Sequence, residues 1–254
     1  MLFLILSAGI FGLIFGSFAN VCVHRIPLRI SVVSPGSRCP SCETAIAWYD
    51  NIPLLSWLLL GGKCRHCKAA ISFRYPLLEL FMGLSWAALA WHFGFSVELL
   101  QALFLVSLLW VLTLIDLETG LLPNVLTFPG IGIGLIFAYW LGYVQDAVIG
   151  AVIGYGAFWL IARIFLLITG REGMGYGDFK LLAMLGAFMG WQALPFIIFA
   201  SSFVGAILGS VLLLVAKKHM RAEIPFGPYL AVAGMVWFIW GTDILSWYAG
   251  LIRA

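Results

Sequence analysis

Eight apolar stretches constrain the fold of this chain, because most of them are close to the ~20 residues that a helix needs to cross a bilayer. They occupy residues 2–23, 76–93, 97–115, 124–142, 146–168, 179–192, 194–216 and 228–250, of which 179–192 is the shortest. Only 10% of the 254 residues are charged, against roughly a quarter in soluble domains. We therefore expect an all-α, polytopic membrane protein with about eight transmembrane helices in the lipid bilayer.

Lysine and arginine are distributed unevenly between the connections, which indicates how the chain crosses the membrane. The connections at 94–96, 143–145 and 193 contain none, whereas those on the opposite face contain nearly all of them. The first apolar stretch has no basic segment before it and no cleavage site after it, so we expect a retained helix. Residues 24–75 and 169–180 are then cytosolic. The small net charge of +3 and the scattered basic residues give no indication of nucleic-acid binding.

The hydrophilic segment 24–75 contains two Cys-x-x-Cys pairs separated by twenty-one residues. The four cysteines are Cys39, Cys42, Cys64 and Cys67. Two such pairs can supply four thiolates to one tetrahedral zinc ion. The ion is expected to be structural, because four thiolates leave no open position for water or substrate. His66 is then a bystander, and Cys22 is expected to be a buried packing residue.

Two other interpretations of the cysteines are disulfide bonds and a thioredoxin-like redox pair. A reducing cytosol argues against disulfides, and the absence of a βαβ pattern argues against the redox pair. No internal repeat is evident in the sequence. We divide the chain into a first transmembrane helix (1–23), a cytosolic four-cysteine zinc loop domain (24–75) and a seven-helix membrane core (76–254).

Two aspartates lie at the ends of apolar stretches, where a charge is costly. Asp116 follows the stretch 97–115, and Asp178 precedes the stretch 179–192. Carboxylates at such positions are rare and are functional by default. Both are expected on the cytosolic face, and two neighbouring carboxyl groups can share a proton, as in aspartic proteases. We predict that Asp116 and Asp178 form a catalytic pair.

Four further residues are expected to support this pair. Gly175 and Gly177 lack side chains, which allows a substrate strand or a neighbouring helix to approach closely. Lys180 and Glu79 lie at the cytosolic border, although a salt bridge to Arg74 would be a sufficient structural explanation for Glu79. The residues that bind a cofactor cannot be assigned from the sequence.

The helix dipoles suggest how the two aspartates divide their roles. Asp178 begins a helix, which favours its ionised form, whereas Asp116 ends one, which favours its protonated form. We expect Asp178 to be the resting base and Asp116 the resting acid. The structural alternative is that Asp178 caps its helix and Asp116 is a border residue.

Two function classes other than a protease remain open. One is a transporter or channel whose aspartates relay protons, for which carboxylates near the bilayer midplane and broken helices are typical. The other is a non-catalytic assembly factor that uses the zinc loop for docking. Such a factor has no need of two aspartates.

The sequence resembles the type IV prepilin peptidases, which are membrane aspartic proteases of the Gly-x-Gly-Asp class. The resemblance covers nearly the whole chain. It rests on Gly16–Val21, His24–Pro27, the four-cysteine loop, Asp50–Trp57, Arg74–Glu79, Asp116 with Leu122–Asn124, Gly173–Lys180 and Pro225–Pro228.

This resemblance implies cleavage of the short basic leader of prepilins and pseudopilins after a glycine, on the cytosolic side of the bacterial inner membrane. Members with the four-cysteine loop commonly also methylate the new N-terminal amine, usually of phenylalanine, with S-adenosylmethionine. By resemblance the two aspartates take the catalytic positions and the four cysteines take the zinc positions. Cytosolic carboxylates such as Glu43, Asp50, Glu118 and Glu172 could attract the basic leader.

Overall fold

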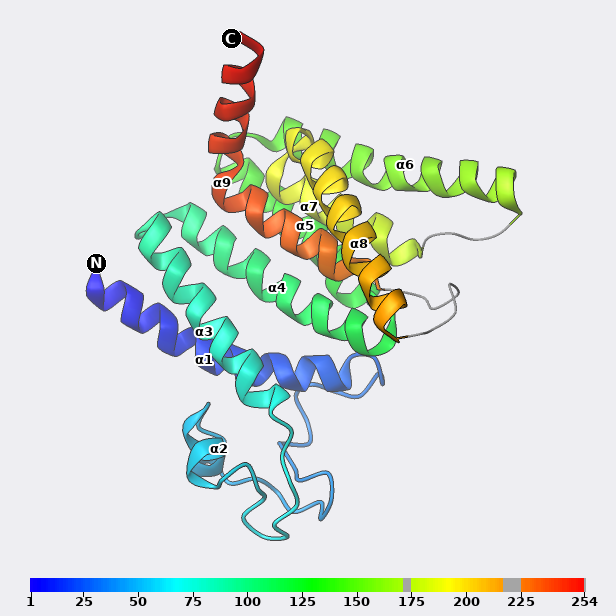
Figure 1. Cartoon of the computed structure of the whole chain (residues 1–254). Helices are drawn as coiled ribbons and strands as arrows, with labels where there is room; N and C mark the ends of the chain where they lie inside the picture. The colour runs from blue at the N-terminus through cyan, green and yellow to red at the C-terminus, as the bar shows by residue number, and fades with distance from the viewer. Residues whose placement is uncertain (171–174, 217–224, 254) are drawn as a thin grey trace. The chain divides into compact units, whose positions relative to one another are not determined.

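The computed structural model describes residues 1–170, 175–216 and 225–253, and over these residues it consists of helices and loops without a strand (Figure 1). The long helices are α1 (Leu2–Arg25), α3 (Arg74–Phe93), α4 (Val97–Thr119), α5 (Asn124–Trp140), α6 (Val144–Thr169), α7 (Tyr176–Met189), α8 (Leu194–Ala216) and α9 (Gly227–Arg253). Three short helices are η1 (Trp48–Asp50), α2 (Leu55–Leu59) and η2 (Trp191–Ala193). The predicted all-α class is confirmed, and each of the eight apolar stretches is helical.

Among the described residues, five helical segments are long and apolar enough to cross a membrane: α1, α4, α6, the segment Gly227–Tyr248 of α9 and the segment Trp191–Val211, which is mostly α8. Helix α5 has 17 residues and α7 has 14, fewer than the ~20 that a span needs. Helix α3 has 20 residues but is less apolar. The chain therefore has the helices of a membrane protein, but the predicted count of eight spans is not confirmed.

The contacts within the chain divide it into two units, Met1–Val111 and Leu112–Ala254. The division falls inside α4. The domain boundaries predicted after residues 23 and 75 are based on changes in amino-acid composition, whereas the two units are based on contacts. The predicted boundaries stay a prediction.

In the first unit, α1 and α3 are antiparallel and approach each other closely at a glycine. A Cβ atom on Gly16 would lie only 2.7 Å from the Cα atom of Glu79. One turn further along α1, the Nδ2 atom of Asn20 donates a hydrogen bond to the carbonyl of Tyr75 at 3.1 Å. Small residues commonly allow such close contact between membrane helices. Here the contact brings Asn20 to the beginning of α3.

In the second unit, α7 is a core helix that contacts α5, α6 and α9 (Figure 1). Every residue from Asp178 to Phe188 except Lys180 is buried. Gly154 of α6 permits the close approach of this helix, because a Cβ atom there would lie 2.7 Å from the carbonyl oxygen of Leu182. A short apolar helix of this kind is typical of a protein core, which accounts for the length of the stretch 179–192.

Candidate active site and metal centre

Both predicted catalytic aspartates belong to the second unit, and both side chains are buried. Asp116 lies in the last turn of α4 with 5% of its surface exposed, and Asp178 lies in the first turn of α7 with 9% exposed. The two groups are close enough for the charge of Asp116 to act on Asp178. Two buried carboxyl groups in electrostatic contact can hold one proton between them, so that one is acidic while the other is ionised.

The N-terminus of α9 holds Asp116 in place. The backbone N–H of Gly227, the first residue of α9, donates to the Oδ2 atom of Asp116 at 3.0 Å. A Cβ atom on residue 227 would lie 2.6 Å from the same oxygen, so this contact requires glycine. A helix N-terminus favours a negative charge. The prediction that Asp116 is the resting acid is based only on its place at the C-terminal end of α4. Because the N-terminus of α9 also contacts Asp116, the helix dipoles no longer favour the ionised form of one aspartate over the other.

Leu122 packs against one glycine beside each of the two aspartates. A Cβ atom on Gly177 would lie 2.9 Å from the Cβ atom of Leu122, and one on Gly227 would lie 3.4 Å from its Cδ1 atom. Gly177 is therefore closely packed against a loop side chain, whereas the predicted approach of a substrate strand or a neighbouring helix stays a prediction. At Gly175 a Cβ atom would approach, among the described residues, only Asp178 Oδ2 at 3.9 Å and the Gly177 nitrogen at 4.0 Å. Among the described residues, Gly175 thus leaves space beside the Asp178 carboxyl group.

Lys180 connects α7 to the beginning of α5. Its Nζ atom donates a hydrogen bond to Asn124 Oδ1 at 2.6 Å and lies 5.8 Å from the centre of the Phe128 ring. Among the described residues, no ion pair joins Lys180 to either aspartate. Its contacts indicate that Lys180 positions α7 and does not touch the two carboxyl groups.

Glu79, the other predicted supporting residue, belongs to the first unit. Its side chain is 8% exposed, and its Oε2 atom accepts the backbone N–H of Leu54 at 2.9 Å. No ion pair to Glu79 is present in the part of the chain that the structure describes. Glu172 and Gly173, which precede Gly175 in the sequence, lie outside the described residues.

The four predicted metal ligands come together in the first unit. The Sγ atoms of Cys39, Cys42, Cys64 and Cys67 all lie within 4.8 Å of one another. Cys39 Sγ and Cys67 Sγ are 3.7 Å apart. Tetrahedral ligands with zinc–sulfur bonds of about 2.3 Å have sulfur atoms about 3.8 Å apart. The cluster can therefore hold a tetrahedral metal ion, and His66 is not part of it.

Each cysteine pair lies in the same local fold. In both, the N–H of the first cysteine, Cys39 or Cys64, donates to the carbonyl five residues later. The N–H of the residue four positions later donates back to the carbonyl of that cysteine. This residue is Glu43 in the first pair and Lys68 in the second, with φ of 56° and 60°. The structure corrects the expectation that the chain has no internal repeat, and both segments share the pattern Cys-x-x-Cys-x-x-Ala-Ile.

Hydrogen bonds within these segments favour the thiolate form of Cys42 and Cys64, whereas burial and the neighbouring cysteines raise the pKa of Cys67 to about 11. The hydroxyl and the backbone N–H of Thr44 lower the pKa of the Cys42 thiol to about 6. The backbone N–H groups of Cys67 and His66 lower the pKa of Cys64. Because the thiolate is the form that binds metal ions, the local backbone prepares these side chains as ligands.

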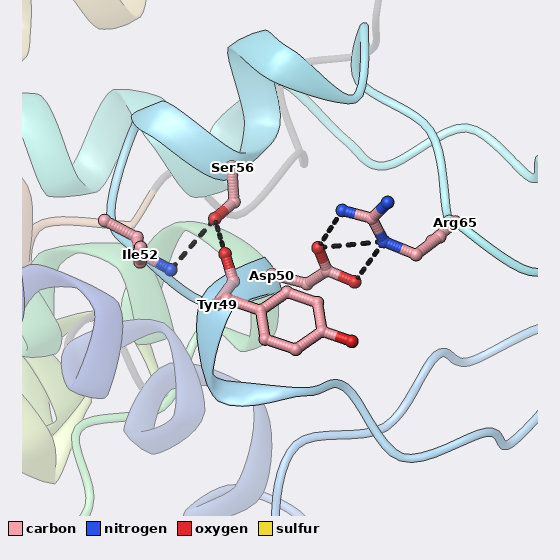
Figure 2. A network of polar contacts seen from close by, with 5 residues as sticks. All are labelled: Tyr49, Asp50, Ile52, Ser56 and Arg65. Atoms are coloured by element: carbon pink, nitrogen blue, oxygen red, sulfur yellow. Dashed lines mark hydrogen bonds and ion pairs between the residues drawn. The ribbon is translucent and has the colours of Figure 1, made fainter.

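A bidentate ion pair connects the second cysteine pair to the segment before α2 (Figure 2). Arg65 Nε lies 2.8 Å from Asp50 Oδ2, and Arg65 Nη2 lies 2.6 Å from Asp50 Oδ1. The Ser56 hydroxyl stabilises the adjacent turn by donating to the Tyr49 carbonyl and accepting the N–H of Ile52. The hydrogen bonds that Asp50 accepts from Arg65 lower the pKa of the Asp50 carboxyl group. The charge of Asp50 is thus already paired, which weakens the expectation that it attracts a basic leader.

The sequence reasoning did not identify Gly227 or Leu122 as site residues. Gly227 lies in the segment Pro225–Pro228, which is part of the family resemblance. That resemblance is the sequence feature that could have identified Gly227 as a site residue. Leu122 precedes Pro123 and Asn124 in another such segment, but nothing in the sequence indicates that it contacts glycines of two other helices.

Comparison with known proteins identifies relatives over nearly the full length. Residues 10–93 match the bacterial peptidase A24 N-terminal domain, and residues 103–210 match the type IV leader peptidase family. No solved structure matches this chain.

Three of the relatives bear the name prepilin leader peptidase/N-methyltransferase. The protein from Stutzerimonas stutzeri is 45% identical over 98% of this chain and 95% of its own length. The protein from Pseudomonas aeruginosa is 45% identical over 96% and 93%, and that from Neisseria gonorrhoeae is 40% identical over 95% and 92%. Together with the two buried aspartates and the four-cysteine cluster, these matches show that the chain belongs to the type IV leader peptidase family.

Proposed function

We propose that this protein is a membrane aspartic endopeptidase that removes the basic leader of prepilins and pseudopilins by cutting after a glycine. The same protein then methylates the new N-terminal amine. The observation that carries the peptidase activity is the pair of buried, electrostatically coupled aspartates, Asp116 and Asp178. The similar proteins are named for both activities.

The two aspartates would act as a general base and a general acid. The ionised carboxylate removes a proton from water, whose oxygen attacks the carbonyl carbon of the scissile peptide. The protonated carboxyl group donates its proton as the amine leaves. The N–H of Gly227 holds Asp116 during this exchange. The space beside Gly175 borders on Asp178 and is where we expect the peptide backbone to enter.

The substrate fits a site at a membrane edge. A prepilin carries a charged leader before an apolar helix, so its scissile bond lies where the bilayer begins. Asp116 ends α4, and Asp178 begins the apolar helix α7. The distribution of basic residues favours a cytosolic position for this site and for the zinc loop. We therefore propose a multi-pass protein of the bacterial inner membrane.

The four-cysteine cluster is proposed to bind one structural zinc ion. Its sulfur distances fit zinc, and four thiolates complete a tetrahedral site. Zinc supplies no reactive position there. It would instead hold the two cysteine segments together and thereby fold the loop domain.

For methylation we propose S-adenosylmethionine as the methyl donor, which supplies an electrophilic methyl group on sulfur. The new N-terminal amine is the acceptor, and it exists only after cleavage. The peptidase step must therefore precede the methyl transfer on each molecule.

The decisive experiment is incubation of the purified protein with a prepilin that carries a Gly-Phe junction. Wild type is compared with Asp116→Ala and Asp178→Ala, and with Asp243→Ala as a matched control at an exposed aspartate of α9. Wild type and the control are expected to cut, and the two site variants are not. An intact precursor with wild type, or cleavage by both site variants, would refute the peptidase proposal. Labelled S-adenosylmethionine in the same reaction tests the second activity.

A further inference from the structure

A pocket of about 410 Å³ lies within the first unit, a size typical of a small-ligand site. It is lined by the C-terminal part of α1, the beginning of α3 and the loop domain. Two of its polar side chains, Asn20 and Glu79, come from the helices themselves and are buried at 3% and 8% exposure. Neither belongs to the metal cluster or to the aspartate pair.

Asn20 presents an unused acceptor. Its Nδ2 atom donates to the carbonyls of Gly16 and Tyr75 at 3.3 and 3.1 Å. Because both partners are acceptors, the amide nitrogen must face them. The Oδ1 atom then receives no hydrogen bond from any residue that the structure describes. A buried acceptor without a partner costs free energy, so a donor from outside the chain would be stabilised at this position.

Glu79 presents a second acceptor next to Asn20. It lies one turn after Tyr75, the residue that Asn20 contacts, and its Cα atom faces Gly16. The Leu54 N–H donates to its Oε2 atom, and the Ser17 hydroxyl is a further hydrogen-bond partner of the carboxyl group. The structure records no ion pair to this carboxylate among the described residues. A cationic partner stabilises the ionised form of a buried carboxyl group, and a primary ammonium group, with three donors, can bond to both Glu79 and Asn20.

The remaining lining contains charged side chains, among them Arg25, Arg38, Asp50 and Arg65, as well as apolar ones. Apolar side chains of Ile52, Leu54, Trp57 and Leu60 share the pocket with the two acceptors. An amine that carries an aromatic side chain, such as an N-terminal phenylalanine, fits this combination.

We propose that this pocket binds the new N-terminal amine of the cleaved pilin and that Glu79 is its catalytic base for methylation. This inference rests on the proposed methyl transfer. The ammonium group gives one proton to Glu79, and the free amine nitrogen then attacks the methyl carbon of the sulfonium donor. The N–CH₃ bond forms as the S–CH₃ bond breaks, and the bonding electron pair stays on sulfur, which leaves as a neutral thioether.

The first test measures binding to the purified full-length protein without a methyl donor. The probe is a peptide of the mature pilin N-terminus beginning with phenylalanine, and its N-acetylated form lacks the ammonium group. Wild type should bind the free amine at least about tenfold more tightly, as expected for a hydrogen-bonded charge. Glu79→Gln should lose most of this preference, and Glu98→Gln, at an exposed position in α4, should keep it. Equal binding of both peptides by wild type would overturn the proposal.

The second test compares methylation with cleavage in the same samples. Glu79→Gln should lower the methyl groups transferred per cleaved pilin by at least about tenfold. An equal loss of both activities would mean that Glu79 supports the aspartates instead, and no loss would equally refute the proposal. If Glu79→Gln weakens binding of S-adenosylhomocysteine but keeps the preference for the free amine, the carboxylate serves the methyl donor and the proposal is wrong. A wild type that cleaves without methylating would refute the second proposed activity, while peptide binding would still test the amine site.

Discussion

Substitution of Gly227 by alanine should damage catalysis with little change elsewhere. The new Cβ atom would lie 2.6 Å from Asp116 Oδ2 and 3.2 Å from its Cγ atom. Ordinary contact begins near 3.4 Å, so the carboxyl group must move by about 0.8 Å, the difference between 3.4 and 2.6 Å. A displacement of about 1 Å in a catalytic group can cost roughly 100-fold in rate. We expect kcat for prepilin cleavage to fall roughly 10- to 100-fold, with KM little changed.

The assay is cleavage of a prepilin over a range of substrate concentrations, with thermal unfolding measured on the same samples. Gly132→Ala is the matched control, because a Cβ atom on this α5 glycine meets no heavy atom within 4 Å. Its cleavage rate should equal that of wild type. Cleavage by Gly227→Ala within about twofold of wild type, or an equal loss in the control, would refute the reasoning.

A double-mutant cycle can show that the effect acts through Asp116. Any loss of thermal stability caused by Gly227→Ala should be smaller in an Asp116→Ala background, because that side chain is the first atom group the new methyl meets. Equal losses in both backgrounds would place the clash elsewhere.

Three further predictions follow from the same contacts. Gly177→Ala should lower the unfolding temperature more than Gly175→Ala, because only the first Cβ atom meets Leu122, at 2.9 Å; a larger loss of thermal stability at Gly175 would contradict this packing. Cys39→Ser should lower bound zinc, measured by atomic emission, and destabilise the loop domain, whereas unchanged zinc content would argue against a four-thiolate site. Lys180→Met removes a charged hydrogen bond worth about 1.5–3 kcal/mol and should lower the unfolding temperature, while an unchanged temperature would mean that the bond to its α5 partner is not formed.

The helices were predictable because each is an apolar stretch bounded by glycine or charged residues. The number of membrane spans was not, because apolar length alone does not separate a lipid-crossing helix from a core helix such as α7. α7 is buried because it packs against α5, α6 and α9. The apolar pattern of α7 itself does not predict these contacts.

The sequence singles out the two aspartates and the four cysteines for different reasons, and their catalytic and metal-binding roles stay predictions. A charged residue at the end of an apolar stretch is rare, so it is easily recognised in a sequence. Two cysteines in Cys-x-x-Cys spacing can both bind one metal ion, so the spacing itself predicts the site. Gly227 could not be placed in the same way, because it reaches Asp116 across 111 residues of sequence. The amide orientation of Asn20 likewise depends on the carbonyl of Tyr75, 55 residues away.

The burial of α7 has a consequence for how the protein is made. A helix of 14 residues with an aspartate in its first turn is a poor candidate for insertion into a membrane by itself. It must enter together with the neighbours that surround it, including α9 at the far end of the chain. Because α9 also supplies the N–H that holds Asp116, the aspartate pair is complete only when synthesis has reached the last helix. A chain synthesised only as far as α8 therefore lacks a contact that holds the aspartate pair of the proposed protease site.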